Sequence, residues 1–273
     1  KQSTSLSSVK LDSGYLVADD STQIKPYAPH IELVTRHGSA KHRAVVEGIN
    51  LITLLWADGD ISIPADWCVF DQESDGLSKN DHLRQMLETA REPGFKPDCV
   101  LWDSWYSSLG NFKMLPAWGW SFFVGLKSNR QLNPDGEEIE RLEMLVPAAG
   151  TENPFKGGWV GDLRSCRGDD RTPRFFINKQ ETSLDEAQVQ QDEKNNIESA
   201  IGDSNKVHIE RCQAGKAGKQ RNQIMLALPA FVRLEWKRYT SGISRWALKQ
   251  DIIRRAVGAY LQEPRYILDY STA

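Results

Sequence analysis

The sequence lacks any apolar stretch long enough to cross a bilayer, since such a span takes about 20 consecutive, mostly apolar residues and the chain contains none. The opening residues 1–8 are polar and have no apolar segment of the kind that secretory signals carry. These two absences argue against a membrane protein and against a secreted one. We therefore expect a cytoplasmic protein without a membrane partner.

Cysteine is also scarce, and the sequence has neither internal repeats nor low-complexity tracts. The four cysteines are far apart and form no Cys-x-x-Cys pair, so the closely spaced ligands of a structural zinc site are missing. We expect all four to be reduced, partly buried thiols: Cys68, Cys99, Cys166 and Cys212.

An overall excess of positive charge is missing too. The formal net charge is −3, which by itself argues against a polyanionic partner. The charges are unevenly distributed, however, because residues 206–255 contain twelve Lys or Arg residues and only three acids, while the rest of the chain holds 22 basic and 34 acidic residues. Basic blocks are often only solvated helix faces, but the size of this one favours a polyanion as the partner.

What the chain does contain is a regular series of short apolar runs and amphipathic stretches before residue 131. The apolar runs predict strands at 14–22, 48–56, 61–70, 99–102 and 120–126, and residues 23–46 read as irregular. Apolar residues at helical spacing predict helices at 80–91 and at about 108–116. Because the later strands are joined through helices, the sequence predicts an α/β fold with a mixed sheet flanked by helices.

The rest of the chain divides into two further parts. Residues 131–180 are rich in glycine, proline and short apolar runs, which predict a small β-rich insertion. Residues 181–268 predict C-terminal helices, with the clearest patterns at 221–239 and 243–261. The predicted organisation is therefore a core in 14–130, an insertion in 131–180, and a helical part in 181–268 that completes the core.

Two aspartates are the first candidates for chemistry, because open α/β sheets place their sites at the carboxyl ends of strands. Asp20 and Asp103 each end a predicted strand. Hard cations such as Mg²⁺ prefer carboxylate oxygens and keep several waters, so few protein ligands suffice. Such a pair would suit metal-assisted phosphoryl transfer. An aspartate at a strand end is more often a turn or helix cap, however, so position alone does not decide its role.

Several segments resemble, in the same order along the chain, the motifs of insertion-sequence DDE transposases. The first acidic motif is matched by Leu16–Thr22 with Lys25-Pro26, followed by Arg36-His37, Lys41-His42 and Gly48–Trp56. The second is matched by Val100–Ser108, and the strand after it by Gly125–Arg130. The closing helical region is matched by Ile209–Ala214, Gln220–Asn222 and Phe231–Glu235. The resemblance covers residues 14–130 and 207–268.

This resemblance implies a ribonuclease H-like fold with a β-rich insertion before the last catalytic helix. It also implies that the protein cuts DNA strands and transfers them at insertion-sequence ends, with Mg²⁺ or Mn²⁺ as the cofactor. In the family, the first catalytic acid directly precedes a pair of hydroxyl residues, which is Asp20 here, with Asp19 as its neighbour. Asp103 is the second acid. Both are expected to hold the metal ions.

The third acid of the family lies on a helix after the insertion, within the pattern Tyr-x-x-Arg-x-x-x-Glu followed by a Lys. Its best placement here is Glu198, as a catalytic residue and a metal ligand. The chain departs from the pattern, because Gln191 replaces the Tyr, Lys194 replaces the Arg, and Lys206 falls one residue late. The alternative is that Glu198 is an exposed acid in a segment rich in acids.

The resemblance further implies that the partner is double-stranded DNA, at the transposon ends and at the target, and that the protein is nucleoid-associated. Basic residues from three parts of the chain are the candidates for DNA contact: Arg36, His37, Lys41, Lys127, Arg130, Lys206, Lys216, Lys219 and Arg221. For each of them, ordinary solvated charge is the alternative. We expect the tryptophans to pack in the core rather than to stack on bases: Trp56, Trp102, Trp105, Trp118 and Trp120.

Two other functions stay open. The divergent segment 179–206, and the short stretch ahead of the first acidic motif, would suit a catalytically inactive remnant that only binds DNA. A metal-dependent nuclease of the same fold, without transposition, is the other alternative. A homodimer is compatible with the sequence.

Overall fold

The computed structural model describes residues 12–27, 30–39, 44–92, 94–127, 129–133, 139–142, 152–155, 158–162, 175–178, 186, 189–192, 194–195 and 209–263. The strands of its first half are β1 (Tyr15–Ile24), β2 (Thr35–Ser39), β3 (Ala44–Asp58), β4 (Ile61–Val69), β5 (Cys99–Trp102) and β6 (Phe122–Leu126). The helices between them are α1 (Gln72–Asp75), α2 (Lys79–Arg91), the 3-10 turn η2 (Ser104–Tyr106) and α3 (Leu109–Ala117). The predicted strands and helices of residues 14–130 are thus present, with small shifts of their ends.

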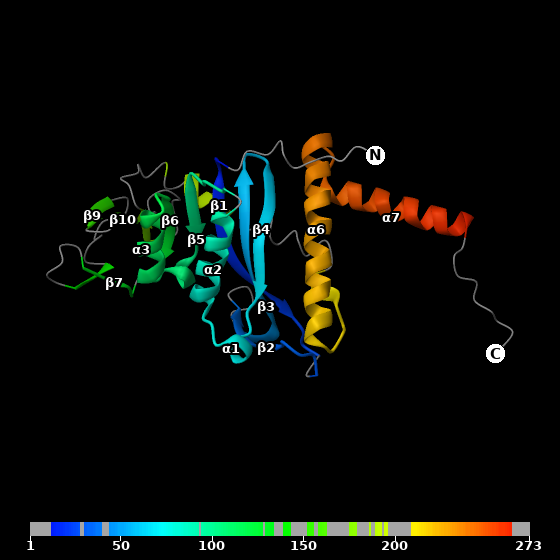
Figure 1. The fold of residues 1–273 in the computed structure, drawn as a ribbon, viewed down its shortest axis with the longest axis horizontal. Coiled ribbons are helices and arrows are strands. Elements are labelled where there is room, and N and C mark those ends of the chain that lie inside the picture. Colours follow the sequence, from blue (N-terminus) through cyan, green and yellow to red (C-terminus); the bar gives the residue numbers. More distant parts are fainter. Residues whose placement is uncertain are drawn as a thin grey trace.

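The order and direction of these strands define the fold (Figure 1). In the sheet, β4 and β2 pair with one edge of β3, and β1, β5 and β6 follow on its other side. Strand β3 is antiparallel to β1, β2 and β4, whereas β5 is parallel to both β1 and β6. Three meandering strands followed by two parallel strands, with helices on the faces, make the fold ribonuclease H-like. The predicted fold class is therefore confirmed.

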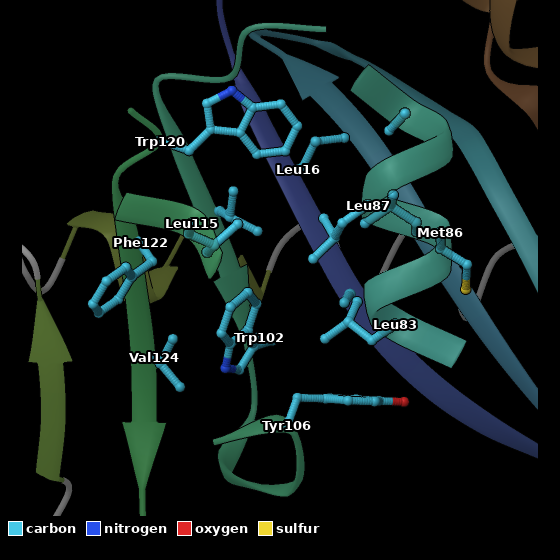
Figure 2. Packing of buried hydrophobic residues seen from close by; sticks show 14 of the residues in the cluster. Leu16, Leu83, Met86, Leu87, Trp102, Tyr106, Leu115, Trp120, Phe122 and Val124 are labelled. Carbon is cyan, nitrogen blue, oxygen red and sulfur yellow. The ribbon is translucent and has the colours of Figure 1, made fainter. Parts of the chain in front are cut away.

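The core between the sheet and α2 is built from alternate residues of the strands (Figure 2). Leu16 and Ala18 of β1 point to the face that α2 and α3 cover, where Leu83 and Trp102 are also buried, and Val17 belongs to a separate cluster. This alternation follows from the two-residue period of a strand. The same alternation places Asp20, two residues after Ala18, on the face of the sheet that α2 covers.

The strand β2 lies in a segment that the sequence predicted to be irregular, and this prediction was wrong. Its residues contain no apolar run, and they form a strand because they pair with the first part of the long strand β3. Gly48 of β3 is opposite Thr35 of β2 and Ile24 of β1. A Cβ atom there would lie 2.5 Å from the carbonyl oxygen of Gln23, so only glycine allows the strands to approach this closely.

In the segment predicted as a β-rich insertion, the described residues form five short strands: β7 (Gln131–Leu132), β8 (Glu140–Arg141), β9 (Glu152–Phe155), β10 (Gly158–Asp162) and β11 (Phe175–Asn178). Of these, β11 pairs antiparallel with β6, and β10 and β9 follow, so they extend the main sheet. The strands β7 and β8 form a small sheet of their own.

The C-terminal part contains the turn η5 (Ile209–Arg211) and the helices α6 (Ala217–Ser241) and α7 (Arg245–Gln262). Helix α6 covers the second face of the sheet, where Ile224 and Leu228 pack with Ile49 and Leu51 of β3. Helix α7 extends away from the body after the left-handed residue Gly242 (Figure 1). Among the described residues, no helix combines the length and the apolar character that a membrane span requires.

Candidate active site

Asp20 lies on the α2 side of the sheet, beyond the last apolar residue of β1 on that face. The Nδ2 of Asn50 on β3 donates a hydrogen bond of 2.9 Å to its Oδ2. The sequence predicted Asp20 at the end of a strand, but β1 continues to Ile24 because it stays paired with β3. The neighbouring strand β5 does end here, since its last residue Trp102 is level with Ala18. Asp20 is therefore beside the carboxyl end of β5.

Asp103 follows β5 directly and begins the turn η2. Its Oδ1 accepts a hydrogen bond of 2.8 Å from the backbone N–H of Trp105, so it caps this turn. Capping is the ordinary role of an aspartate at a strand end. This hydrogen bond holds the Asp103 carboxylate at the same end of the sheet as Asp20. Whether Asp103 also binds a metal ion stays a prediction.

The pKa of Tyr106 responds to the charges of both carboxylates. Its side chain is fully buried at one end of the core, beyond Trp102 and Leu83 (Figure 2), and its hydroxyl has no hydrogen-bond partner among the described residues. Burial raises the pKa of Tyr106 far above its ordinary value, and the negative charges of Asp20, Asp103 and Asp19 raise this pKa further. The structure thus brings both predicted acids to the end of the core where Tyr106 is buried.

Lys79 is a member of this site that the sequence analysis missed. It is the first residue of α2, and its Nζ contacts Asp20 Oδ2 directly in a partly buried ion pair. The helix start is well defined, because the N-cap Ser78 and Asp81 form a reciprocal capping box. That capping box could be read from the sequence. The pairing of Lys79 with a residue of another strand could not.

Two aromatic rings lie around the Lys79 ammonium group. Its Nζ is 5.4 Å from the ring centroid of Phe70 and 5.8 Å from that of Trp105. The Nζ of Lys127 is 4.2 Å from the same Trp105 centroid. Trp105 is 61% exposed, so the expectation that it packs in the core was wrong. Its neighbour Tyr106 takes the buried position of this short turn instead.

Arg130 links the two loops that border the site. Its guanidinium donates a hydrogen bond of 2.8 Å to the carbonyl oxygen of Ser107, which ties the chain after β6 to the chain after β5. On the inner side, the buried amide of Asn111 on α3 donates to Tyr106 O at 2.7 Å and to Asn80 Oδ1 at 2.8 Å. The turn that carries Asp103 and Trp105 is therefore held by α2, α3 and the loop after β6.

Of the described residues of the predicted basic cluster, His37 is the one that lies near this region, with its ring centroid 6.4 Å from that of Phe70. Burial, and then the charge of Lys79, lower its pKa below the ordinary value, whereas Asp20 raises it. His37 Nε2 lies 2.7 Å from Thr35 Oγ1. Its neighbour Arg36 is exposed. Of the two, His37 therefore shares the environment of Asp20 and Lys79.

The start of α6 lies at the same end of the sheet, because Lys25 Nζ at the end of β1 donates to the carbonyl oxygen of Cys212 at 2.8 Å. Three predicted DNA-contacting residues are here. Lys216 pairs with Glu32 at 2.8 Å, and Arg221 pairs with Asp71 at 3.5 Å. The third, Lys219, is exposed.

Three predicted site residues, Lys41, Glu198 and Lys206, lie outside the described residues. Lys194, which takes the place of the family's Arg, is described and is buried. Over the described part of the chain, no three His, Cys, Asp or Glu residues gather closely enough to hold a metal ion.

The carboxylate pair nevertheless fits a hard divalent cation. Mg²⁺ is commonly bound by one or two carboxylates, with waters and substrate phosphates completing its shell. Asp20 and Asp103 supply oxygens of this type at neighbouring positions of the sheet. Mg²⁺ or Mn²⁺ thus suits these residues better than a softer metal that takes sulfur ligands.

Cysteine chemistry is not part of the site. Cys68, Cys99 and Cys212 are free thiols, as expected, and Cys166 lies outside the described residues. Burial raises the pKa of both Cys68 and Cys99 to about 12. Both thiols therefore stay protonated at neutral pH and are poor nucleophiles.

No protein-family model matches the sequence, and no curated protein matches it. Among solved structures, the chain is similar to piggyBac transposase in a cryo-EM structure of its synaptic complex with hairpin DNA, with a TM-score of 0.48 and 13% sequence identity. The match covers 88% of this chain and 56% of the piggyBac chain, so this chain spans little more than half the length of that protein. At this level of similarity, nothing about the chemistry of the site carries over.

Proposed function

We propose that this chain is the catalytic core of a DNA transposase, which cuts DNA at insertion-sequence ends and joins the cut strand to a target with the help of Mg²⁺ or Mn²⁺. The observation that carries the proposal is that Asp20 on β1 and Asp103 just after the adjacent strand β5 come together at one end of the sheet. This gathering occurs where β5 ends beside β1 in a ribonuclease H-like sheet. The motif resemblance points to the same two acids.

In this reaction Asp20 and Asp103 would hold the cation, which when bound would stabilise negative charge on the reacting phosphate. Asn50 orients Asp20 through its hydrogen bond, and the backbone of Trp105 orients Asp103. Tyr106 stays a neutral hydroxyl donor because of its raised pKa. A water, and then a DNA 3′ hydroxyl, would attack the phosphate in line.

The exposed cations at the rim would position the DNA rather than take part in the chemistry. Lys127 and Arg130 lie just after β6, next to the turn that carries Asp103. Contacts from lysine and arginine to phosphate oxygens fix the register of a nucleic acid on a protein. Lys216, Lys219 and Arg221 at the start of α6 would extend this contact along the same end of the sheet.

The third carboxylate has two candidates. Glu198 is the residue that matches the family pattern best, and it lies outside the described residues. Glu210 belongs to η5, whose backbone lies against β1 near the hydrogen bond from Lys25 to Cys212, and its side chain also lies outside the described residues. We propose comparing Glu198→Gln with Glu210→Gln, because the residue that supplies the ligand should lose cleavage while the other variant keeps it.

Cleavage of a supercoiled plasmid that carries the DNA flanking this gene tests the proposal. With Mg²⁺ or Mn²⁺ we expect nicking and strand joining, and a loss of at least about 100-fold in Asp20→Asn and Asp103→Asn, because both remove a metal-binding charge. Asp58→Asn is the matched control, since Asp58 is exposed at the opposite end of β3. Equal activity in all the variants would refute the assignment of the two acids.

A DNA-binding protein without catalysis is the second candidate. It is favoured by the Lys79–Asp20 ion pair and by the lack of a three-acid cluster among the residues that the structure describes. Such a protein would bind the same plasmid DNA and cut it with neither metal ion. Cleavage without strand joining would instead indicate a nuclease.

A further inference from the structure

Lys79 brings a positive charge to a carboxylate that the proposed function assigns to a divalent cation. Its Nζ contacts Asp20 Oδ2, and the two side chains are only 22% and 15% exposed. At this partial burial, charges interact more strongly than they do in bulk water. An ammonium group and a divalent cation would repel each other if both stayed on Asp20. The two cations therefore compete for this carboxylate.

The stability of α2 does not explain why a lysine stands at this position. Lys79 is the first residue of the helix, between the N-cap Ser78 and the acidic Asp81. The first turn of a helix carries the positive end of its dipole, where acids stabilise and lysines destabilise. The favourable interaction that Lys79 makes is instead the contact with Asp20, across the interface between α2 and β1.

The surroundings offer the Lys79 ammonium group a second location. Phe70 and Trp105 have their ring centroids 5.4 Å and 5.8 Å from its Nζ. Aromatic faces attract ammonium groups within about 6 Å. The lysine stem is flexible, and the capping box fixes the backbone beneath it. Both rings are already within this range, so the ammonium group can leave Asp20 and remain beside them, above all beside Phe70, without a change in the helix.

We propose that Lys79 is a built-in counter-ion of Asp20, which an incoming divalent cation displaces toward the faces of Phe70 and Trp105. This inference rests on the proposed function, because it takes Asp20 to be a metal ligand. In the metal-free protein Lys79 neutralises Asp20 and stabilises the end of the core. It also lowers the metal affinity below what the carboxylates alone would give.

Titration of the full chain with Mn²⁺ in the absence of DNA, with free Mn²⁺ measured by electron paramagnetic resonance, tests this role. Lys79→Met keeps the length of the side chain and removes its charge. We expect its Kd for Mn²⁺ to fall on the order of tenfold, the scale of a partly buried ion pair. Lys96→Met is the control, because Lys96 is exposed just before β5, at the opposite end of the sheet, and it should keep the wild-type Kd.

Thermal unfolding gives a second readout. Without metal, Lys79→Met should unfold at a lower temperature than the wild type, and saturating Mn²⁺ should raise its Tm more, because the tighter site binds only the folded state. Lys79→Gln replaces Lys79→Met if the latter does not fold. Equal Mn²⁺ affinity in wild type and variant would overturn the counter-ion role alone. Absence of Mn²⁺ binding in both proteins would overturn this role together with the proposed metal site.

Discussion

Near the end of β1, acidic and basic side chains lie close together in a partly buried region. Asp20 is held by Asn50 and neutralised by Lys79, while the hydroxyl of Tyr106 stays protonated under the influence of the nearby acids. His37 shares this environment and is held in its neutral form. Burial and the neighbouring charges thus keep both Tyr106 and His37 neutral at this end of the core.

His37 predicts a dependence of stability on pH. Burial, together with the charge of Lys79, holds its pKa below the ordinary value of 6.5. Between the unfolded pKa and this lower folded pKa, the unfolded chain binds more protons than the folded one, so stability falls as the pH is lowered through this window. Thermal unfolding of wild type and His37→Gln, measured from neutral pH down to about pH 5, should show a steeper loss in the wild type. Parallel profiles would contradict this.

The sequence predicts some of these residues and cannot predict others. Asp20 and Asp103 are identified as candidates because the predicted strand ends and the motif resemblance mark them locally, although β1 in fact continues past Asp20. Lys79 pairs with Asp20 across 59 positions of the chain, and no local pattern encodes such a contact. The exposure of Trp105 depends on how a short turn is oriented on the core, which composition does not reveal. The metal roles of both acids remain predictions.

Among the secondary-structure elements, β4, α6 and α7 are joined by one buried carboxylate. Glu235 on α6 is 1% exposed, and its carboxylate accepts a hydrogen bond of 3.3 Å from the N–H of Ser62 on β4. It also pairs with Arg238 at 2.7 Å and with Arg245, the first residue of α7, at 3.1 Å. This carboxylate therefore orients α7 relative to the sheet.

We expect Glu235→Ala to be strongly destabilising, because it removes a buried acceptor that two guanidinium groups and a backbone N–H share. Removing one member of a buried charge network costs about 3–5 kcal/mol, which urea unfolding can measure. Asp251→Ala is the control, since the Asp251–Arg255 pair on α7 is exposed and should contribute less than about 1 kcal/mol. Similar losses in both variants would show that Glu235 does not connect these elements.

The elements themselves are predictable where burial dictates their pattern. Strands β5 and β6 are short apolar runs, and α2 has apolar residues at helical spacing, so each is found close to its observed bounds. Strand β2 is not, because its residues are polar and form a strand only through pairing with β3. For the same reason β1 runs past its apolar part to Ile24. Pairing between distant segments is the information that a local pattern lacks.

Over the whole molecule, the proposed chemistry and the basic residues share one end of the sheet. The carboxylates lie where β5 ends, and α6 begins nearby, tied to the end of β1. The basic block of residues 206–255 is partly neutralised in the fold, since several of its members pair with acids, as Lys216 does with Glu32. We therefore expect fewer phosphate contacts than the count of basic residues suggests.

Lys219 tests whether this end of the molecule contacts DNA. It is exposed at the start of α6, and each phosphate contact makes DNA affinity more sensitive to salt. We expect Lys219→Ala to weaken binding equally for all DNA sequences and to reduce the slope of log Kd against log salt concentration by about 1. Lys96→Ala is the control, because Lys96 is exposed just before β5, at the opposite end of the sheet. The same slope in wild type and Lys219→Ala would exclude this contact.

The central claim is that Asp20 and Asp103 together hold a divalent cation. A crystal structure of the protein with saturating Mn²⁺, phased to show the anomalous signal of the metal, tests it most directly. The account predicts an anomalous peak in contact with both carboxylates, with the ammonium group of Lys79 moved away from Asp20. A map without metal at these two residues, and with Lys79 still on Asp20, would contradict it.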